Sequence, residues 1–168
     1  MIVRRERPED VPAVRAVVAA AFDGGDGVIP VEVGLLDRLR EDVGWIPRFS
    51  LVAEDAGELV GHVVATRGHA GDGPALGIGP VAVRPDRQGR GVGTALLHTL
   101  LGAAEAQDEE LVVLLGEPAW YGRFGFVPAA DLGVDGPDPA WGGYFQARRF
   151  TPTAPRGAFR YAAPFDDL

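Results

Sequence analysis

A glycine-rich turn in the middle of the chain separates an apolar run from a helical pattern, and it limits the folds that the chain can adopt. Residues 83–97, VRPDRQGRGVGTALL, contain three glycines and three arginines. Val92, Leu96 and Leu100 share one helical face, which predicts a buried helix that ends near Gln107. The start of a helix carries backbone N–H groups without partners and the positive end of the helix dipole. The turn therefore predicts a site for an anion.

Strands and helices are expected to alternate along the chain. Strands are predicted at residues 1–6, 50–55, 58–69, 75–83, 111–115 and 144–150, with another from Phe126, and helices at 8–22, 33–43, 92–107 and 119–124. This order predicts an α/β (α+β) fold in which a mixed sheet carries helices on both faces. A chain of 168 residues is expected to form a single domain, 1–168, with a core over about 1–150 and an irregular tail at 151–168.

The predicted strand at 75–83, ALGIGPVAV, is interrupted by Gly77, Gly79 and Pro80. Glycine weakens a strand interior, and proline has no N–H to donate to a neighbouring strand. A bulge or bend is therefore expected within this strand, with a lapse in its hydrogen-bond ladder at Gly79–Pro80.

The net charge and the absence of lysine and cysteine exclude several classes of function. The net charge is −8, which argues against a protein that binds nucleic acid by neutralising phosphates. All 16 basic residues are arginine, so the chain offers no lysine for a Schiff base. It also contains no cysteine, which excludes disulfides, thiolate metal sites and a cysteine acyl-enzyme.

The N-terminal residues superficially resemble a signal peptide. Glu9, Asp10 and Arg15 interrupt that pattern, and the apolar residues recur at helical spacing. No run reaches the roughly 18 apolar residues of a membrane span, so a cytoplasmic protein without a membrane partner is expected.

Two common phosphate-binding motifs do not fit the glycine turn. A P-loop requires lysine, which the chain lacks. A dinucleotide-binding turn belongs after the first strand, and its acidic residue would close the following strand; here the turn follows the fourth strand and LVVLL has no such residue.

The turn resembles the acetyl-CoA-binding signature of the GNAT superfamily of N-acetyltransferases. Gln88, Gly91 and Gly93 match its central pattern, and the order of elements and the later YGRFGF segment extend the resemblance over nearly the whole chain. It implies a mostly antiparallel central sheet that is splayed between the fourth and fifth strands. Acetyl-CoA is then the acyl donor.

The resemblance also implies which residues contact the coenzyme. The pyrophosphate would bind at the turn, with charge added at its rim by Arg87 or Arg90, and the pantetheine arm would pair with the backbone of the fourth strand. The implied coenzyme-binding residues are Val81, Ala82, Val83, Gln88, Gly89, Arg90, Gly91, Val92, Gly93 and Thr94.

The reaction implied is direct attack of an amine on the thioester in a ternary complex. A backbone N–H within Val81–Val83 would hold the oxyanion. Tyr121 stands four residues before Gly125–Phe126, where family members commonly carry a tyrosine that protonates the departing sulfur. A phenol of pKa ~10 can donate to a thiolate of pKa ~8.5.

The sequence offers several candidates for the general base that would deprotonate the amine. Many relatives carry a glutamate or histidine at positions that correspond to Gly77 or Gly79, and glycine cannot accept a proton. Glu117 could act directly or through water, or could instead cap the following helix. The weaker candidates are Glu54, Asp72 and His69. An acceptor that arrives as a neutral amine would need no base.

Other side chains favour structural roles. His62, His69 and His98 lack the spacing of metal ligands, so no metal is expected. The aromatic residues that could line an acceptor pocket, although core packing is favoured for them, are Trp45, Phe49, Trp141, Tyr144 and Phe145. Trp120, Phe124 and Phe126 are assigned to packing.

The sequence leaves the acceptor open, as a small molecule or a protein amine, and is compatible with a homodimer. Two other functions remain as alternatives. One is a non-catalytic sensor or regulatory module that binds acyl-CoA, and the other is a redox enzyme that uses a nicotinamide cofactor.

Overall fold

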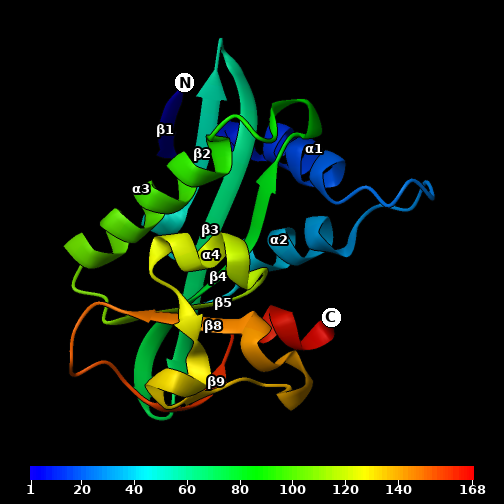
Figure 1. Ribbon diagram of the computed structural model, residues 1–168. Coiled ribbons are helices and arrows are strands. Elements are labelled where there is room, and N and C mark those ends of the chain that lie inside the picture. Colours follow the sequence, from blue (N-terminus) through cyan, green and yellow to red (C-terminus); the bar gives the residue numbers. More distant parts are fainter.

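The computed structural model describes all 168 residues and contains a central sheet with helices on both faces (Figure 1). The helices are α1 (Val11–Ala21), α2 (Val31–Glu41), α3 (Val92–Ala106) and α4 (Pro118–Tyr121). The strands are β1 (Ile2–Arg5), β2 (Ser50–Asp55), β3 (Glu58–Ala70), β4 (Gly73–Val83), β5 (Leu111–Leu115), β6 (Val127–Pro128), β7 (Val134–Asp135), β8 (Phe145–Arg149) and β9 (Gly157–Arg160). None of the helices combines the length and apolar character that a membrane crossing requires.

The main sheet follows the order β1-β2-β3-β4-β5-β8-β6, and its only parallel neighbours are β4 and β5. These two strands pair only at Leu76 with Val112 and at Gly77 with Val113. Beyond Gly77 they separate, which leaves the second half of β4 without a neighbour on that side. The predicted splay between the fourth and fifth strands is therefore confirmed.

An irregularity in β4 coincides with the start of this splay. Val81 pairs with Val63 and Ile78 with Ala65, so that Gly79 and Pro80 together face the single residue between them on β3. The extra residue is a β-bulge, as the sequence predicted. Proline cannot donate a ladder hydrogen bond, which accounts for a bulge at this point.

Helices cover the two faces of the sheet with separate apolar clusters. On one face α3 buries Leu96, Leu97 and Leu100 against β2, β3 and β4. On the other face α1 and α2 bury a cluster that includes Val14 and Leu36. Helix α3 on one side and helices α1 and α2 on the other therefore enclose the sheet (Figure 1).

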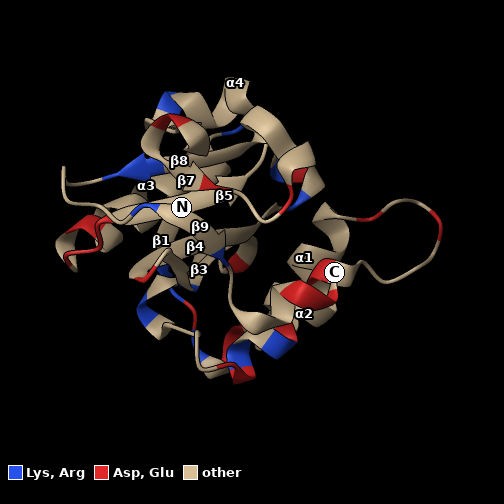
Figure 2. Cartoon of the chain, turned by 90° about the horizontal axis from the view of Figure 1, so that it is seen from below, with Lys and Arg blue, Asp and Glu red and all other residues tan.

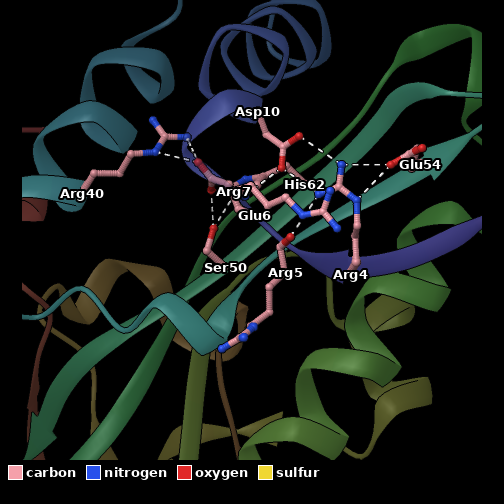
Figure 3. Close-up of polar contacts among 9 residues, drawn as sticks. All are labelled: Arg4, Arg5, Glu6, Arg7, Asp10, Arg40, Ser50, Glu54 and His62. Atoms are coloured by element: carbon pink, nitrogen blue, oxygen red, sulfur yellow. Dashed lines mark hydrogen bonds and ion pairs between the residues drawn. The ribbon is translucent and has the colours of Figure 1, made fainter.

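A buried polar network lies beneath α1 and α2 (Figure 3). Glu6 accepts a hydrogen bond from Ser50 and lies 3.0 Å from Nε2 of His62, whose ring is fully buried. Arg40 of α2 pairs with the same carboxylate at 2.7 Å. Burial lowers the pKa of His62, and the nearby Glu6 carboxylate only partly opposes this. Burial acts on Glu6 in the opposite direction and raises its pKa, but hydrogen bonds from His62 and Ser50 outweigh burial and bring the pKa of Glu6 below its usual value. His62 therefore stays neutral near neutral pH and has a structural role.

The C-terminal segment corrects one expectation. Residues 151–168 were expected to be irregular, but β9 pairs with the end of β3 and with β7, and residues 163–167 form a 3-10 helix beside α2. Phe159 of β9 is 2 % exposed. The reason is tertiary, because a four-residue strand that begins with a glycine has little local signal and is stabilised by partners distant in sequence.

Candidate active site

A groove of about 630 Å³ lies where the glycine turn meets β4 and α4. Its lining residues are Val81, Val83, Arg87, Gln88, Gly89, Gly91, Val92, Gly93, Thr94, Trp120, Tyr121 and Arg123. The structure thus brings together most of the residues expected to contact a coenzyme. Trp120 and Arg123 were not expected there, because their position depends on how α4 packs over the start of α3.

The floor of this groove offers free backbone donors. The first hydrogen bond within α3 joins Ala95 N–H to the carbonyl of Gly91 at 2.9 Å, so the N–H groups of Val92, Gly93 and Thr94 have no partner within the helix. Gly91 has a φ of +84°, which favours glycine, and a Cβ there would have no neighbour within 4 Å. The space above the donors is open, and the arrangement fits a diphosphate.

The outer half of β4 presents unpaired backbone groups toward the splay. Arg84 N–H donates to Val60 of β3, and the alternation of an antiparallel ladder therefore directs the N–H groups of Val81 and Val83 away from β3. Gln88 donates from Nε2 to the carbonyl of Val83 at 3.1 Å, which bridges this edge to the turn. Ala82 has its side chain buried on the opposite face.

The arginines near the turn differ in whether they form ion pairs with carboxylates. Arg87 is paired with Asp55 at 2.5 Å, whereas Arg90 is exposed and makes no ion pair. Arg123 lines the groove with its guanidinium 5.8 Å from the ring of Trp120. Arg123 therefore lines the groove without a carboxylate partner, whereas Arg90, which was expected there, lies next to two lining glycines but outside the lining itself.

A second cavity, of about 700 Å³, lies on the other side of the splay. It is lined largely by apolar and aromatic side chains from α2, β4 and the C-terminal segment, together with Phe22, which follows α1. Val81 and Tyr121 line both cavities, so the two meet at the gap between β4 and β5. Of the aromatic residues proposed for an acceptor pocket, only Trp141 lines this cavity; Phe49 and Phe145 are core residues.

Tyr121 stands at the junction of the two cavities. Its ring packs edge-on against Trp120 and Phe126, with ring centroids 4.6 Å and 6.0 Å away. Its hydroxyl makes no hydrogen bond to another side chain. Burial raises the pKa of Tyr121 to about 12, so the phenol keeps its proton at neutral pH and can donate it.

The carboxylates considered as bases lie elsewhere. Glu117 is exposed, accepts a hydrogen bond from Ala119 N–H at 3.3 Å and caps α4; it lines neither cavity. Glu54 pairs with Arg4, Asp72 lies in the β3–β4 turn, and His69 pairs with β9. The observed contacts favour the capping alternative for Glu117, and its role as a base stays a prediction.

Several cavity residues were missed by the sequence analysis. The carboxylates that line the second cavity are Glu32 and Asp166, and its unexpected aromatic residues are Phe22, Phe159, Tyr161 and Phe165. Most of them belong to the C-terminal segment that was expected to be irregular. The alternation of Phe159 and Tyr161 in GAFRY is the one local signal that could have identified a strand with a functional face.

Known proteins resemble this chain in sequence. Residues 47–128 match the acetyltransferase (GNAT) domain. The chain is 30 % identical over 161 residues to the uncharacterized N-acetyltransferase YhbS of Escherichia coli strain K12, covering 94 % of this chain and 92 % of that protein. It is 35 % identical over 135 residues to the uncharacterized N-acetyltransferase YjhQ of the same strain, covering 77 % of this chain and 72 % of that one.

Solved structures share the fold over almost the whole chain. A GNAT family acetyltransferase from Brucella melitensis in complex with acetyl-CoA is 34 % identical, with a TM-score of 0.81 and coverage of 98 % of this chain and 97 % of that one. YhbS from Escherichia coli in complex with CoA is 28 % identical, with a TM-score of 0.87 and coverage of 98 % and 91 %. Together with the splayed sheet and the glycine turn, these similarities show that the chain belongs to the GNAT family of acetyltransferases.

Proposed function

We propose that this protein is an N-acetyltransferase that transfers the acetyl group of acetyl-CoA directly to an amine in a ternary complex, within a single domain of residues 1–168. The observation that carries this proposal is the meeting of two cavities at one gap in the sheet, where both are lined by Val81 and Tyr121. A coenzyme in the groove and an acceptor in the second cavity could therefore meet without moving between sites.

The groove supplies what a CoA diphosphate and its pantetheine arm require. The unpaired N–H groups of Val92, Gly93 and Thr94 would hold the diphosphate, and Arg90 and Arg123 would add charge at the rim. The free backbone edge at Val81 and Val83 would pair with the amide-containing arm in the manner of an added strand. The solved relatives bound to acetyl-CoA and CoA support this assignment.

Acetyl-CoA supplies an activated thioester, and the chain would contribute orientation and proton handling. The N–H of Val81 or Val83, which faces the gap, would stabilise negative charge on the carbonyl oxygen. Tyr121 would give its proton to the leaving sulfur, and its pKa of about 12 keeps the phenol protonated at neutral pH. No cysteine is available for an acyl-enzyme, which favours direct transfer.

Calorimetry and product analysis test the proposal together. The protein should bind acetyl-CoA but not NAD, and it should release free CoA thiol only when an amine acceptor is added. Intersecting initial-rate lines with acetyl-CoA and amine would support a ternary complex, whereas parallel lines would contradict it. Binding of acetyl-CoA without turnover of any amine would favour the alternative, a regulatory acyl-CoA sensor.

A further inference from the structure

The walls of the second cavity are aromatic over a continuous stretch. Phe159 and Tyr161 pack edge-on with centroids 4.8 Å apart, and Phe165 follows at 4.7 Å from Tyr161. Trp141 and Leu35 face the same space. Its volume of about 700 Å³ suits a small molecule rather than a folded protein surface. A polar polyamine or sugar would leave several of its groups without hydrogen bonds against these walls, which is costly.

The cavity also contains a carboxylate without a partner. Glu32, in the first turn of α2, is half-buried and makes neither an ion pair nor a hydrogen bond with any protein group. Asp166 lies exposed at the rim and is also unpaired. Figure 2 shows acidic segments where the C-terminal end meets α2, and the whole chain carries a net charge of −8. This environment favours a cation.

The one arginine of the cavity is directed elsewhere. Arg160 is exposed on β9, and its guanidinium donates to the carbonyl of Gly71 in the β3–β4 turn at 3.4 Å. Arg160 forms no ion pair, and this one hydrogen bond draws its guanidinium toward the turn. An acceptor with its own carboxylate would meet two carboxylates, Glu32 and Asp166, against this one arginine, so the balance of charge in the cavity opposes it.

From these observations, and on the basis of the proposed function, we infer that the acceptor is a small primary amine on an aromatic or branched apolar body without a carboxylate, and that Glu32 binds its ammonium group. An ammonium–carboxylate hydrogen bond is charge-assisted and gains strength where water is partly excluded. The apolar body would pack against the aromatic wall formed by Trp141, Phe159, Tyr161 and Phe165.

The assignment also gives the proton a destination. The bound ammonium transfers one proton to the Glu32 carboxylate, which releases it to solvent at the rim. The nitrogen lone pair then forms the C–N bond while the C–S bond breaks. Tyr121 protonates the sulfur and recovers a proton from the acetylated nitrogen. The products are an amide, a neutral thiol and one proton in solution, so charge and atoms balance.

A comparison of acetylation rates with different amines tests the proposed class of acceptor. Initial rates are measured with acetyl-CoA and phenethylamine, isoamylamine, spermidine, glucosamine or phenylalanine. We expect kcat/KM for the two apolar amines to exceed that for the other three by at least about tenfold, a difference of about 1.4 kcal/mol in transition-state binding. A preference for spermidine, glucosamine or phenylalanine would overturn the inference, and so would turnover of none of them by protein that binds acetyl-CoA.

Variants of α2 test the role of Glu32. Glu32→Gln should raise KM for phenethylamine at least about tenfold, because the charge that binds the ammonium is removed, and should also lower kcat, because glutamine cannot accept the proton. KM for acetyl-CoA should stay within about twofold. Glu41→Gln is the matched control, since Glu41 is exposed at the other end of α2 and lines no cavity. An unchanged KM for the amine in Glu32→Gln would refute the assignment. Failure of the wild-type protein to bind acetyl-CoA would instead refute the proposed function itself.

Discussion

The ring of Tyr161 lies against the backbone of Gly77, so closely that a Cβ at Gly77 would stand 2.6 Å from Cδ1 and 2.7 Å from Cε1 of the tyrosine. Gly77 is one of the β4 positions at which the family resemblance implies a general base, a glutamate or a histidine, in many relatives. In this protein the ring of Tyr161, from the C-terminal segment, occupies the space that such a side chain would need. The glycine is thus explained by packing. A general base, where the acceptor needs one, would come from another element, and Glu32 is the candidate that our further inference adds to Glu117.

Gly77→Ala should therefore destabilise the protein and disturb the acceptor cavity. Overpacking of this kind typically costs about 1–3 kcal/mol in the free energy of unfolding, measured with denaturant. Gly102→Ala, on the exposed face of α3 where a Cβ meets nothing, should be neutral or stabilising. In a Tyr161→Ala background the penalty of Gly77→Ala should disappear, and persistence of the full penalty there would show that another contact causes it.

Tyr121→Phe tests the acid. We expect kcat to fall by about 10²-fold with little change in KM for acetyl-CoA, because the variant keeps the ring packing and loses only the proton donor. Since burial raises the pKa of Tyr121 to about 12, its ionisation should produce no alkaline decline of kcat below about pH 11. Tyr144→Phe, at an exposed tyrosine that lines neither cavity, is the control. Full activity of Tyr121→Phe under conditions where chemistry limits the rate would remove Tyr121 from this role.

Gly91→Glu tests the anion site. The substitution puts a carboxylate beside the free N–H groups of α3, and we expect calorimetry to detect no binding of acetyl-CoA. The φ of +84° at Gly91 also makes any side chain unfavourable by about 1–2 kcal/mol. Gly91→Ala shares that strain without the charge and should retain measurable binding, while Gly102→Glu adds the charge at a distance and should bind normally. Equal affinities of Gly91→Glu and Gly91→Ala would contradict an anion at this turn.

The buried His62 should make the protein sensitive to acid. Burial lowers the pKa of His62 in the folded state, whereas the unfolded chain takes up the proton near pH 6.5. Below about pH 6.5 the unfolded state therefore binds more protons, and the free energy of unfolding should fall by up to about 1.4 kcal/mol per pH unit. The lowered pKa of Glu6 adds a further loss only below its ordinary value of 4.5.

Denaturant titrations between about pH 7 and pH 5 measure this dependence. His62→Gln should be less stable at neutral pH but should show a shallower slope, because glutamine does not titrate. His98→Gln, at an exposed position on α3, should keep the slope of the wild-type protein. A slope that is the same in His62→Gln and the wild type would assign the acid sensitivity to other groups.

Local patterns in the sequence were sufficient for much of the fold. The stripe of Val92, Leu96 and Leu100 predicted α3, and LVVLL predicted β5 at residues 111–115. Gly79–Pro80 predicted the bulge, because proline lacks an N–H wherever it occurs. The glycine turn predicted free N–H groups for the same kind of reason, since the start of any helix leaves them unpaired.

The residues that line the second cavity could not be predicted from local sequence patterns. Glu32, Tyr161 and Asp166 are far apart in the sequence, and each looks locally like a surface residue or part of a tail. They share a cavity only because β9 pairs with β3 and the final 3-10 helix packs beside α2. The sequence by itself determined most of the elements and the unpaired N–H groups at the start of α3, because these depend on backbone geometry within a few residues. The second cavity was decided by the tertiary structure, because long-range strand pairing and helix packing alone bring these side chains together.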